Sequence, residues 1–247
     1  MYNFNIIKLD AIPSSNDFLK QRHYENSAKN DDLCWAGFQT KGRGQHQNRW
    51  NAAAGKNLTF SVYKVFEGFS LGQSFLLNAA VCVAVVEALK EIGLFDTKVK
   101  WPNDILSANK KIGGILIENS TQSKSIKSSV IGIGLNVNQI DFEGLPQASS
   151  LMLASGKKWE LEAVLKQLLF RLRLVFDAFE QGERASFLAP YNALLWQRKE
   201  PSEFSRGEHS FLATLMGVNK NGKALIELPN REQHAYSFNE LKMNYRV

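Results

Sequence analysis

The sequence KVKWPNDILSANKKIGGILIE, from Lys98 to Glu118, decides which fold this chain adopts. Its first half has an extended pattern that Pro102 interrupts, because proline lacks a backbone donor and holds Trp101 in extended geometry. The asparagine and aspartate that follow favour a tight turn. The sequence therefore predicts a turn that carries polar side chains between two strands.

The second half of this stretch is an apolar run that contains Gly113 and Gly114. Glycine weakens a strand, and a ligand or another backbone lying against the strand is one reason to keep it. Lys111, just before the glycines, indicates a cation beside an apolar slot, as an anionic ligand would require. Two ordinary hairpins with a solvated lysine would have the same residues, so this stretch alone leaves both interpretations open.

A second polar cluster lies near the start of the chain. A predicted strand at 4–9 leads to Ser14, Ser15 and Asn16, which precede a short helical pattern through Tyr24. Serine and asparagine cap helices because their side-chain oxygens accept a bond from an unpaired backbone N–H. The same groups suit a polar ring such as a ureido group, and these residues do not choose between capping and binding.

A glycine-rich basic segment, TKGRGQHQNRW at 40–50, follows a predicted strand at 33–39. Such loops bind phosphate through backbone N–H groups and fixed positive charge. The segment has neither GxxxxGK[ST] nor a GxGxxG that opens a helix, so it is neither a Walker loop nor a dinucleotide fingerprint. By itself, a mobile surface loop explains it better.

A third glycine-containing segment, GIGLNVN at 132–138, ends a predicted strand at 126–133. Two glycines with asparagines at a strand end permit the close approach of a ligand, although a twisted strand with a turn has the same residues. The following segment to Ser150, which contains Gly144 and Pro146, is expected to be a mobile loop.

The remaining periodic segments are expected to form the core and a second domain. Helical spacing of apolar residues predicts long buried helices, and short alternating runs after about Phe204 predict a small β-barrel. The predicted helices lie at 72–92 and 159–180 with a further helical stretch through Trp196, the strands at 57–64, 209–216, 224–228 and 235–238, and a Ser/Lys-rich turn at 120–129. The change of pattern places a boundary near 197–203.

Composition indicates a globular protein of the cytoplasm. Hydrophobic residues make up 44% and charged residues 22%, and we expect no apolar run of the roughly 20 residues that span a membrane and no signal peptide. Cys34 and Cys82 are isolated, so neither a disulfide nor a zinc site is expected. The formal charge of +6 suits anionic partners, but the basic residues are scattered, which does not favour nucleic-acid binding.

Taken together, these segments resemble the catalytic domain of the biotin protein ligases. The segments that carry the resemblance are Ser14-Ser15-Asn16, Gln39 with Gly42-Arg43-Gly44 and Trp50, KWPND at 100–104, KIGGIL at 111–116 and GIGLNVN at 132–138. Their order and spacing match over about residues 5–180, and the pair KWPND and KIGGIL is highly specific.

This resemblance implies an α+β fold. A mixed β-sheet flanked by helices, like that of class II aminoacyl-tRNA synthetases, would form a catalytic domain at 1–198. A small SH3-like β-barrel would form a C-terminal domain at 199–247. The resemblance is to the monofunctional type of ligase, which lacks an N-terminal DNA-binding domain.

The resemblance also implies a two-step reaction. Biotin and MgATP give biotinyl-5'-AMP and pyrophosphate, and a lysine of a biotin carboxyl carrier protein or domain then takes the biotinyl group. A carboxylate that attacks the α-phosphorus brings negative groups together, so the reacting centre needs fixed cations, for which Lys111 and Arg43 are expected. Asp104, the carboxylate of the turn, is expected either to place Mg²⁺ or to orient the acceptor amine.

On the same resemblance, the ureido ring of biotin needs a few polar partners in a mostly apolar slot. The expected biotin-binding residues are Ser14, Ser15, Asn16, Gln39, Arg43, Gly44, Gln45, Lys111, Gly113 and Gly114. The expected nucleotide-binding residues are Arg43, Trp50, Lys100, Asn103, Lys111 and Asn136. The glycine-rich loop and the segment 139–149 are expected to close over the adenylate and exclude water.

The glycine-rich loop departs from the usual GRGRxGRxW of that family. Gln45 stands where an arginine usually holds the adenylate, and Gln47 replaces a glycine. The loss of a fixed cation is expected to loosen retention of biotinyl-adenylate unless Arg49 or Lys41 substitutes. His46 is interpreted as a loop residue only.

Three other functions would also explain part of the sequence. A lipoate or octanoate ligase or transferase of the same superfamily has a similar core, but the KWPND and KIGGIL pair and the C-terminal barrel favour biotin. A DNA-binding regulator is not expected, because the catalytic pattern begins within the first ten residues. A biotin-binding module without catalysis fits the altered loop, but Lys111, Arg43 and Asp104 argue against it. No DNA or membrane partner is expected, and a homodimer is compatible with the sequence but not required by it.

Overall fold

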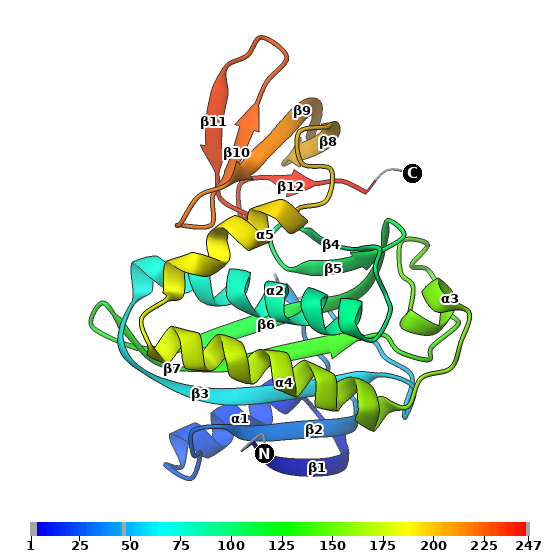
Figure 1. The fold of residues 1–247 in the computed structure, drawn as a ribbon, viewed down its shortest axis with the longest axis vertical. Coiled ribbons are helices and arrows are strands. Elements are labelled where there is room, and N and C mark those ends of the chain that lie inside the picture. Colours follow the sequence, from blue (N-terminus) through cyan, green and yellow to red (C-terminus); the bar gives the residue numbers. More distant parts are fainter. Residues whose placement is uncertain (1–3, 46–47, 246–247) are drawn as a thin grey trace.

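Within residues 4–45 and 48–245, which the computed structural model describes, seven strands form a mixed sheet at the centre of the molecule (Figure 1). The strand order is β1-β2-β3-β7-β6-β5-β4. β1 pairs with β2 in parallel, and the other neighbours pair antiparallel. The strands are β1 Asn5–Ile12, β2 Asp32–Gln39, β3 Leu58–Ser70, β4 Thr97–Lys100, β5 Asp104–Ser107, β6 Lys110–Gln122 and β7 Ser125–Leu135. The predicted mixed sheet is confirmed.

Helices cover both faces of this sheet, because side chains along a strand alternate between its two faces. α2 (Ser74–Glu91) and α4 (Leu161–Glu180) lie on one face, and α1 (Ser15–Tyr24) lies on the other (Figure 1). In β2, Leu33 belongs to the large core beneath α2 and α4, whereas the next residue, Cys34, packs in a small cluster against α1.

The central helix α2 is more apolar than the sequence prediction allowed. The stretch Leu71–Glu91 has the length and composition of a membrane span, with a mean hydropathy of 1.6 over its most apolar window. In the fold, α2 packs between the sheet, α4 and α5 (Leu188–Leu194), and it contributes residues such as Leu77 and Leu89 to the core. It therefore occupies the position of a core helix.

The second helical stretch predicted through Trp196 is present as two short helices, the last of which ends at Leu194. α4 ends at Glu180, and Gly182 follows with a φ of 87°, a left-handed conformation that glycine adopts without strain. The chain then forms the short 3-10 helix η3 (Arg184–Phe187) and α5. Two further short helices are η2 (Leu71–Gln73) and α3 (Leu151–Ser155).

The turn predicted at 120–129 is much shorter in the structure. β6 continues to Gln122 and β7 begins at Ser125, so only two residues connect them. Ser128 and Ser129 are buried within the sheet. The serine-rich composition suggests a loop, but long-range pairing with β3 and β6 determines the structure here.

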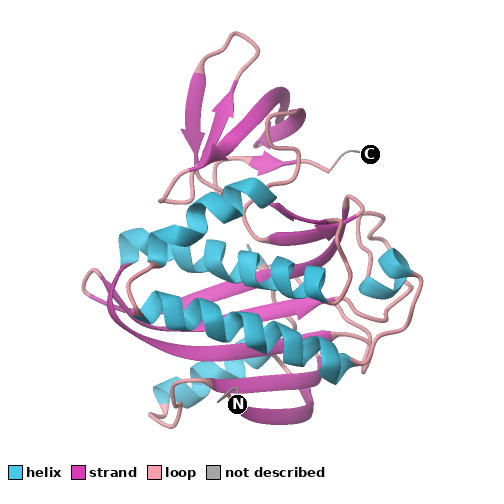
Figure 2. Ribbon diagram, in the orientation of Figure 1, coloured by secondary structure: helices cyan, strands magenta, loops and turns pink. Residues whose placement is uncertain are grey.

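Five further strands of the described chain form a second, antiparallel sheet near the C-terminus (Figure 2). They are β8 Pro201–Arg206, β9 His209–Val218, β10 Ala224–Glu227, β11 Gln233–Tyr236 and β12 Lys242–Met243. Their order, β11-β10-β9-β8-β12, is open rather than closed into a complete barrel. Phe204 and Leu215 of this sheet belong to the same hydrophobic cluster as the core of the larger sheet. The division at 198/199 stays a prediction.

Candidate active site

The predicted WPND turn joins β4 to β5 and is fixed to the neighbouring elements. Lys100 and Asp104 face each other in the β4–β5 pairing. The Asn103 side chain donates to the carbonyl of Ile115 in β6, and the Ile115 N–H donates back to the Asn103 carbonyl at 3.2 Å. Trp101 is buried, and its Nε1 donates to a carbonyl in the β9–β10 turn at 3.1 Å. The turn therefore holds its polar side chains in fixed positions.

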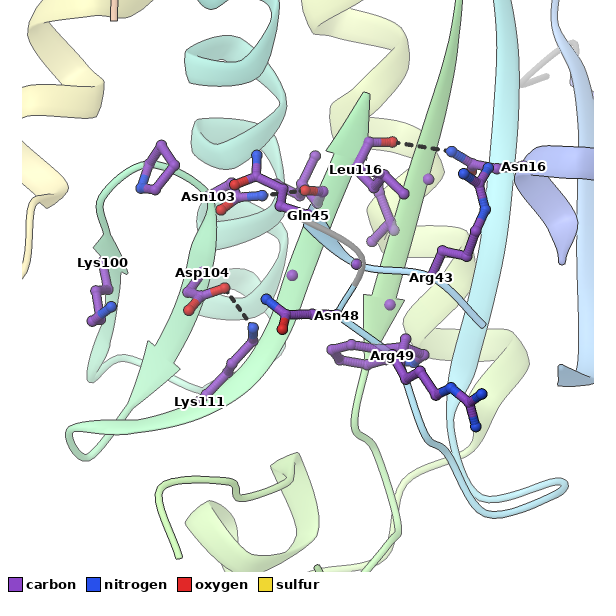
Figure 3. A pocket seen from close by; sticks show the side chains of 18 of the residues that line it. Asn16, Arg43, Gln45, Asn48, Arg49, Lys100, Asn103, Asp104, Lys111 and Leu116 are labelled. Atoms are coloured by element: carbon purple, nitrogen blue, oxygen red, sulfur yellow. Dashed lines mark hydrogen bonds and ion pairs between the residues drawn. The ribbon is translucent and has the colours of Figure 1, made fainter. Parts of the chain in front are cut away.

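A cavity of about 280 Å³ opens beside this turn. Its walls come from the WPND turn, the start of α1, the glycine-rich loop, β6 and β7 (Figure 3). The segment around β12 completes the lining. Most of the predicted site residues line it, namely Ser14, Ser15, Asn16, Gln39, Arg43, Gly44, Gln45, Trp50, Lys100, Asn103, Asp104, Lys111 and Gly114. The fold thus brings together segments that are separate in the sequence.

One side of the cavity is cationic. Lys111 Nζ lies 2.6 Å from Asp104 Oδ1, and the Tyr245 hydroxyl donates to Asp104 Oδ2 at 2.9 Å. Lys100 Nζ lies 4.4 Å from the centroid of the Tyr245 ring. Burial lowers the pKa of Lys100 to about 8; Asp104 opposes this shift, and Lys111 and Lys242 add to it. Three lysines around one carboxylate leave a net positive charge that suits an anionic ligand.

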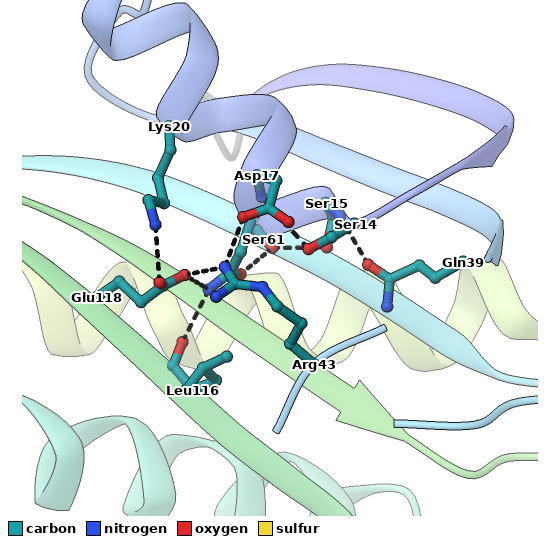
Figure 4. A network of polar contacts seen from close by, with 10 residues as sticks. Ser14, Ser15, Asp17, Lys20, Gln39, Arg43, Ser61, Leu116 and Glu118 are labelled. Carbon is teal, nitrogen blue, oxygen red and sulfur yellow. Dashed lines mark hydrogen bonds and ion pairs between the residues drawn. The ribbon is translucent and has the colours of Figure 1, made fainter. Parts of the chain in front are cut away.

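The other side of the cavity is polar and less charged. The Ser15 N–H donates to Gln39 Oε1 at 2.6 Å, and Ser15 Oγ lies 2.7 Å from Ser61 Oγ (Figure 4). Ser61 Oγ in turn donates to Asn16 Oδ1 at 2.6 Å. Ser14 Oγ accepts from the Asp17 N–H at 3.3 Å, so Ser14 caps α1 while it also lines the cavity.

Arg43 is placed differently from its predicted role. Its Nη2 lies 2.6 Å from Asp17 Oδ1 and 2.8 Å from Glu118 Oε2 (Figure 4). The guanidinium therefore lies next to Asn16 on the polar side, apart from Lys111 (Figure 3). Two carboxylates already balance its charge, so a role beside Lys111 as a cation at the reacting centre does not fit this arrangement.

Two predicted site residues do not line the cavity. A Cβ on Gly113 would lie 2.9 Å from the carbonyl oxygen of Gly134 on the adjacent strand, so this glycine permits close strand packing rather than ligand contact. Asn136 is buried, and its Nδ2 donates to the Ser149 carbonyl at 2.9 Å. The predicted contact of Asn136 with nucleotide does not fit this position.

The segment expected to close over the site is attached to β6 at its end. The Lys111 N–H donates to the Gln147 carbonyl at 2.7 Å, and the Ser149 N–H donates to the Lys111 carbonyl at 2.8 Å. These bonds place 147–149 beside the backbone of a cavity residue. The segment 139–149 therefore supports Lys111, and its closure stays a prediction.

The glycines of β7 make room for side chains of the protein itself. A Cβ on Gly134 would lie 2.5 Å from the Trp50 ring, and a Cβ on Gly132 would overlap Asn16 Oδ1. Trp50 and Asn16 line the cavity together with these glycines. Trp50 Nε1 is buried without a hydrogen-bond partner among the described residues, which leaves a donor for a ligand.

The glycine-rich loop folds back on itself. Arg43 and Arg49 form an isolated antiparallel bridge that brings the two ends of the loop together. Gln45 lines the cavity, and its expected effect on retention of the adenylate stays a prediction. The predictions for His46 and Gln47 lie outside the described residues.

Several residues in or next to the cavity escape prediction from the sequence. Ser61 and Glu118 do not line it but contact the lining residues Ser15 and Asn16. Ser61 belongs to no motif, whereas Glu118 ends the KIGGILIE run, and a charge at the end of an apolar run is a signal for a buried partner. The C-terminal segment contributes Phe238, Leu241, Lys242 and Met243. No local pattern links these residues to a turn more than a hundred residues earlier.

Comparison with known proteins shows the family of this chain. Residues 9–136 match the Biotin/lipoate A/B protein ligase family, and since this match spans more than half of the chain, the chain belongs to that family.

The curated relatives of this chain include proteins named as ligases. The Bifunctional ligase/repressor BirA of Bacillus subtilis (strain 168) is 36% identical over 224 residues, which cover 86% of this chain and 66% of that protein. The Escherichia coli (strain K12) protein of the same name is 26% identical over 228 residues, covering 90% of this chain and 69% of that protein.

The fold is similar to a solved structure described as "Biotin protein ligase from Aquifex aeolicus in complex with biotin and ATP". The TM-score is 0.81 at 27% sequence identity, and the alignment covers 98% of this chain and 99% of that chain.

Proposed function

We propose that this chain is a biotin protein ligase. It activates biotin with ATP to form biotinyl-5'-AMP and pyrophosphate, and it passes the biotinyl group to a lysine of a biotin carboxyl carrier domain. The observation that carries this proposal is that a neutral polar end and a cationic end share one cavity. Biotin has the same two ends, a ureido ring and a carboxylate.

The polar end is suited to the ureido ring. Ser15, Asn16 and Gln39 supply donors and acceptors within hydrogen-bond distance of one another. Gly114 lines the cavity between this end and the Lys111–Asp104 pair, and its missing side chain leaves space for an apolar chain. A few fixed polar groups in a mostly apolar slot are typical of small-molecule sites.

The cationic end serves the first step. A biotin carboxylate oxygen bonds to the α-phosphorus of ATP while the bond from the α-phosphorus to the bridging oxygen breaks, and pyrophosphate leaves. Negative charge accumulates on the phosphate oxygens, and Lys111 and Lys100 are fixed cations beside them. Because both lysines are partly or fully buried, their charges act more strongly than they would in water.

Asp104 is the only carboxylate among the described residues that line the cavity. Mg²⁺ usually binds proteins through one or two carboxylates together with substrate phosphates, so a single carboxylate here fits a metal that arrives with ATP. Asp104 would hold that ion, which would screen phosphate charge. In the second step, the same carboxylate is the group available to orient the amine of the carrier lysine as it attacks the biotinyl carbonyl and AMP leaves.

The reaction needs an assay that separates biotin from the acids used by related ligases. We would measure pyrophosphate release from MgATP with biotin, octanoate or lipoate, using the wild type, Lys111→Ala and the control Lys110→Ala, whose side chain is exposed. Release with biotin alone that is lost only in Lys111→Ala supports the proposal. Release with octanoate or lipoate would instead assign the chain to the lipoate branch of the family.

Transfer to a carrier domain is tested separately by the biotinylation of a purified carrier domain. Replacement of the acceptor lysine in the carrier domain should abolish its biotinylation. We place the reaction in the cytoplasm, which fits the two free, buried cysteines at Cys34 and Cys82.

A further inference from the structure

Glu118 lies behind the polar end of the cavity and joins two of its walls. One oxygen, Oε2, accepts hydrogen bonds from Asn16 Nδ2 and from Arg43 Nη2, each at 2.8 Å (Figure 4). The other oxygen, Oε1, accepts from Lys20 Nζ at 2.9 Å. Asn16 belongs to α1 and Arg43 to the glycine-rich loop, so a single carboxylate oxygen connects the helix, the loop and β6.

The charge state of Glu118 is fixed by these partners. Burial raises its pKa, but the hydrogen bonds from Asn16 and Lys20 and the charge of Arg43 outweigh burial and hold the pKa below its usual value. The side chain is 23% exposed. Glu118 is therefore ionised at neutral pH, and an ionised carboxylate can only accept hydrogen bonds.

Because Glu118 only accepts, it determines the donor and the acceptor in each hydrogen bond of the series that runs from Glu118 through Asn16 and Ser61 to Ser15. Asn16 must turn its NH₂ group toward Glu118, which directs Asn16 Oδ1 toward Ser61. The Ser61 hydroxyl then donates to Asn16 Oδ1, so its oxygen can only accept from the Ser15 hydroxyl at 2.7 Å. The hydroxyl hydrogen of Ser15 is therefore donated to Ser61 and is not available to a ligand.

The consequence for a ligand is that Ser15 Oγ presents only lone pairs to the cavity. Gln39 is oriented in the opposite sense, because its Oε1 accepts from the Ser15 N–H and its Nε2 is left to donate. A group with an N–H beside a carbonyl, as in a cyclic urea, satisfies both. A ligand with no N–H in this position would leave a buried acceptor without a partner, which is costly.

We propose that Glu118 is a positioning residue that fixes the hydrogen-bond polarity of the biotin ring site through Asn16 and Ser61. It does not line the cavity and touches no substrate. This inference rests on the proposed function, because it takes biotin as the ligand.

The test compares Glu118→Met with the wild type, using direct calorimetric binding of biotin and steady-state kinetics. Methionine keeps the length of the side chain but removes both acceptors. We expect the Kd and the KM for biotin to rise about tenfold, as for the loss of one oriented buried hydrogen bond, while the KM for ATP and the kcat stay within about threefold. Glu118→Gln keeps one side-chain oxygen. Arg43 can only donate hydrogen bonds and therefore holds that oxygen in the position of Oε2, so this variant should bind biotin with most of the wild-type affinity.

A second readout is independent of overall stability. The two biotin analogues that carry a methyl group on one ureido nitrogen or the other are compared with biotin for each variant. In the wild type, the analogue that has no N–H for Ser15 binds more weakly than biotin. In Glu118→Met this preference should shrink, because Ser15 can then rotate its hydroxyl toward the ligand.

Lys20→Gln is the matched control. It removes the partner of Oε1 and leaves Asn16 and Arg43 on Oε2, so biotin affinity should not change. The proposal is overturned if Glu118→Met binds biotin and both analogues like the wild type, or if Lys20→Gln weakens biotin as much as Glu118→Met does. A wild type that does not bind biotin would instead refute the proposed function. If Glu118→Met does not fold, Glu118→Ala with the methylated analogues decides, since alanine also removes both acceptors, and unchanged biotin affinity together with an unchanged analogue preference there overturns the proposal.

Discussion

The hydroxyl of Tyr245 donates a hydrogen bond to Oδ2 of Asp104 at 2.9 Å, across 141 positions of sequence. Asp104 lies in the WPND turn, and Tyr245 follows the last strand of the C-terminal sheet. Burial, together with the charge of Asp104, raises the pKa of Tyr245 far above its usual value, so the hydroxyl remains a donor. The C-terminal segment thus helps to orient the only carboxylate among the described cavity residues.

Tyr245→Phe removes this hydrogen bond and keeps the ring beside Lys100. We expect biotinylation of a carrier domain to slow by about tenfold, because Asp104 loses one of its two partners and is held less firmly. The rate of transfer from preformed biotinyl-adenylate measures this effect. Tyr24→Phe, at a side chain that is 71% exposed, is the control, and an unchanged transfer rate in Tyr245→Phe would show that Asp104 does not need this contact.

Gln45→Arg restores a cation in the wall of the cavity. A charge-assisted bond to the adenylate phosphate should slow the escape of biotinyl-adenylate by about tenfold. Escape is measured as the labelling of free amines in the absence of a carrier domain. Gln73→Arg, on the exposed turn η2, adds the same charge elsewhere and should leave escape unchanged. An equal release rate in Gln45→Arg and the wild type would contradict the expected role of this position.

The lowered pKa of Lys100 predicts a pH dependence. Below about pH 8 the side chain is charged and can contact phosphate, and above that value it becomes neutral. The kcat/KM for ATP should therefore fall as pH rises through about 8, by about tenfold at the limit, because this ratio reports ionisation of the free enzyme. Lys100→Arg stays charged and should flatten the profile, while Lys98→Arg, on the exposed side of β4, should keep the wild-type profile. A wild-type profile without a fall in this range would exclude Lys100 from phosphate binding.

Gly132→Ala should disturb the polar end of the cavity. The added methyl group overlaps the Asn16 amide, and overpacking of this kind costs about 1–3 kcal/mol. Denaturant unfolding should show a loss of stability of that size, and the KM for biotin should rise because Asn16 is displaced. Gly72→Ala is the control, since its Cβ would meet only Ser70 Oγ at 3.8 Å. Equal stability of the two variants would mean that Asn16 can move at little cost.

Local sequence signals predict the strands and the turn around which the cavity forms. Pro102 and the polar residues after it predict the β4–β5 turn, and the apolar run after Lys111 predicts the strand β6. Neighbouring side chains of a strand face opposite sides of the sheet, so Gly113 and Gly114 lie on different faces. Only Gly114 lines the cavity, so the prediction that both face a ligand overlooks a rule that the sequence already supplies.

The partners of Arg43 cannot be derived in this way. A basic residue in a glycine-rich loop suggests phosphate, but the structure pairs it with Asp17 and Glu118, which are 26 and 75 positions away. Ion pairs of this kind depend on how α1, the loop and β6 meet in space. The same holds for Trp50 and Gly134, whose fit depends on the packing of a loop against a strand.

The shared hydrophobic core has a practical consequence. The connection at 197–200 is an exposed turn in which Gln197 and Lys199 have positive φ angles, and it joins two segments that each contribute part of the cavity wall. A chain divided at this turn would give two fragments, each with an exposed apolar surface and neither with a complete cavity. Catalysis would return only when the two fragments meet, so this turn is a suitable site for converting the protein into a split reporter of molecular proximity.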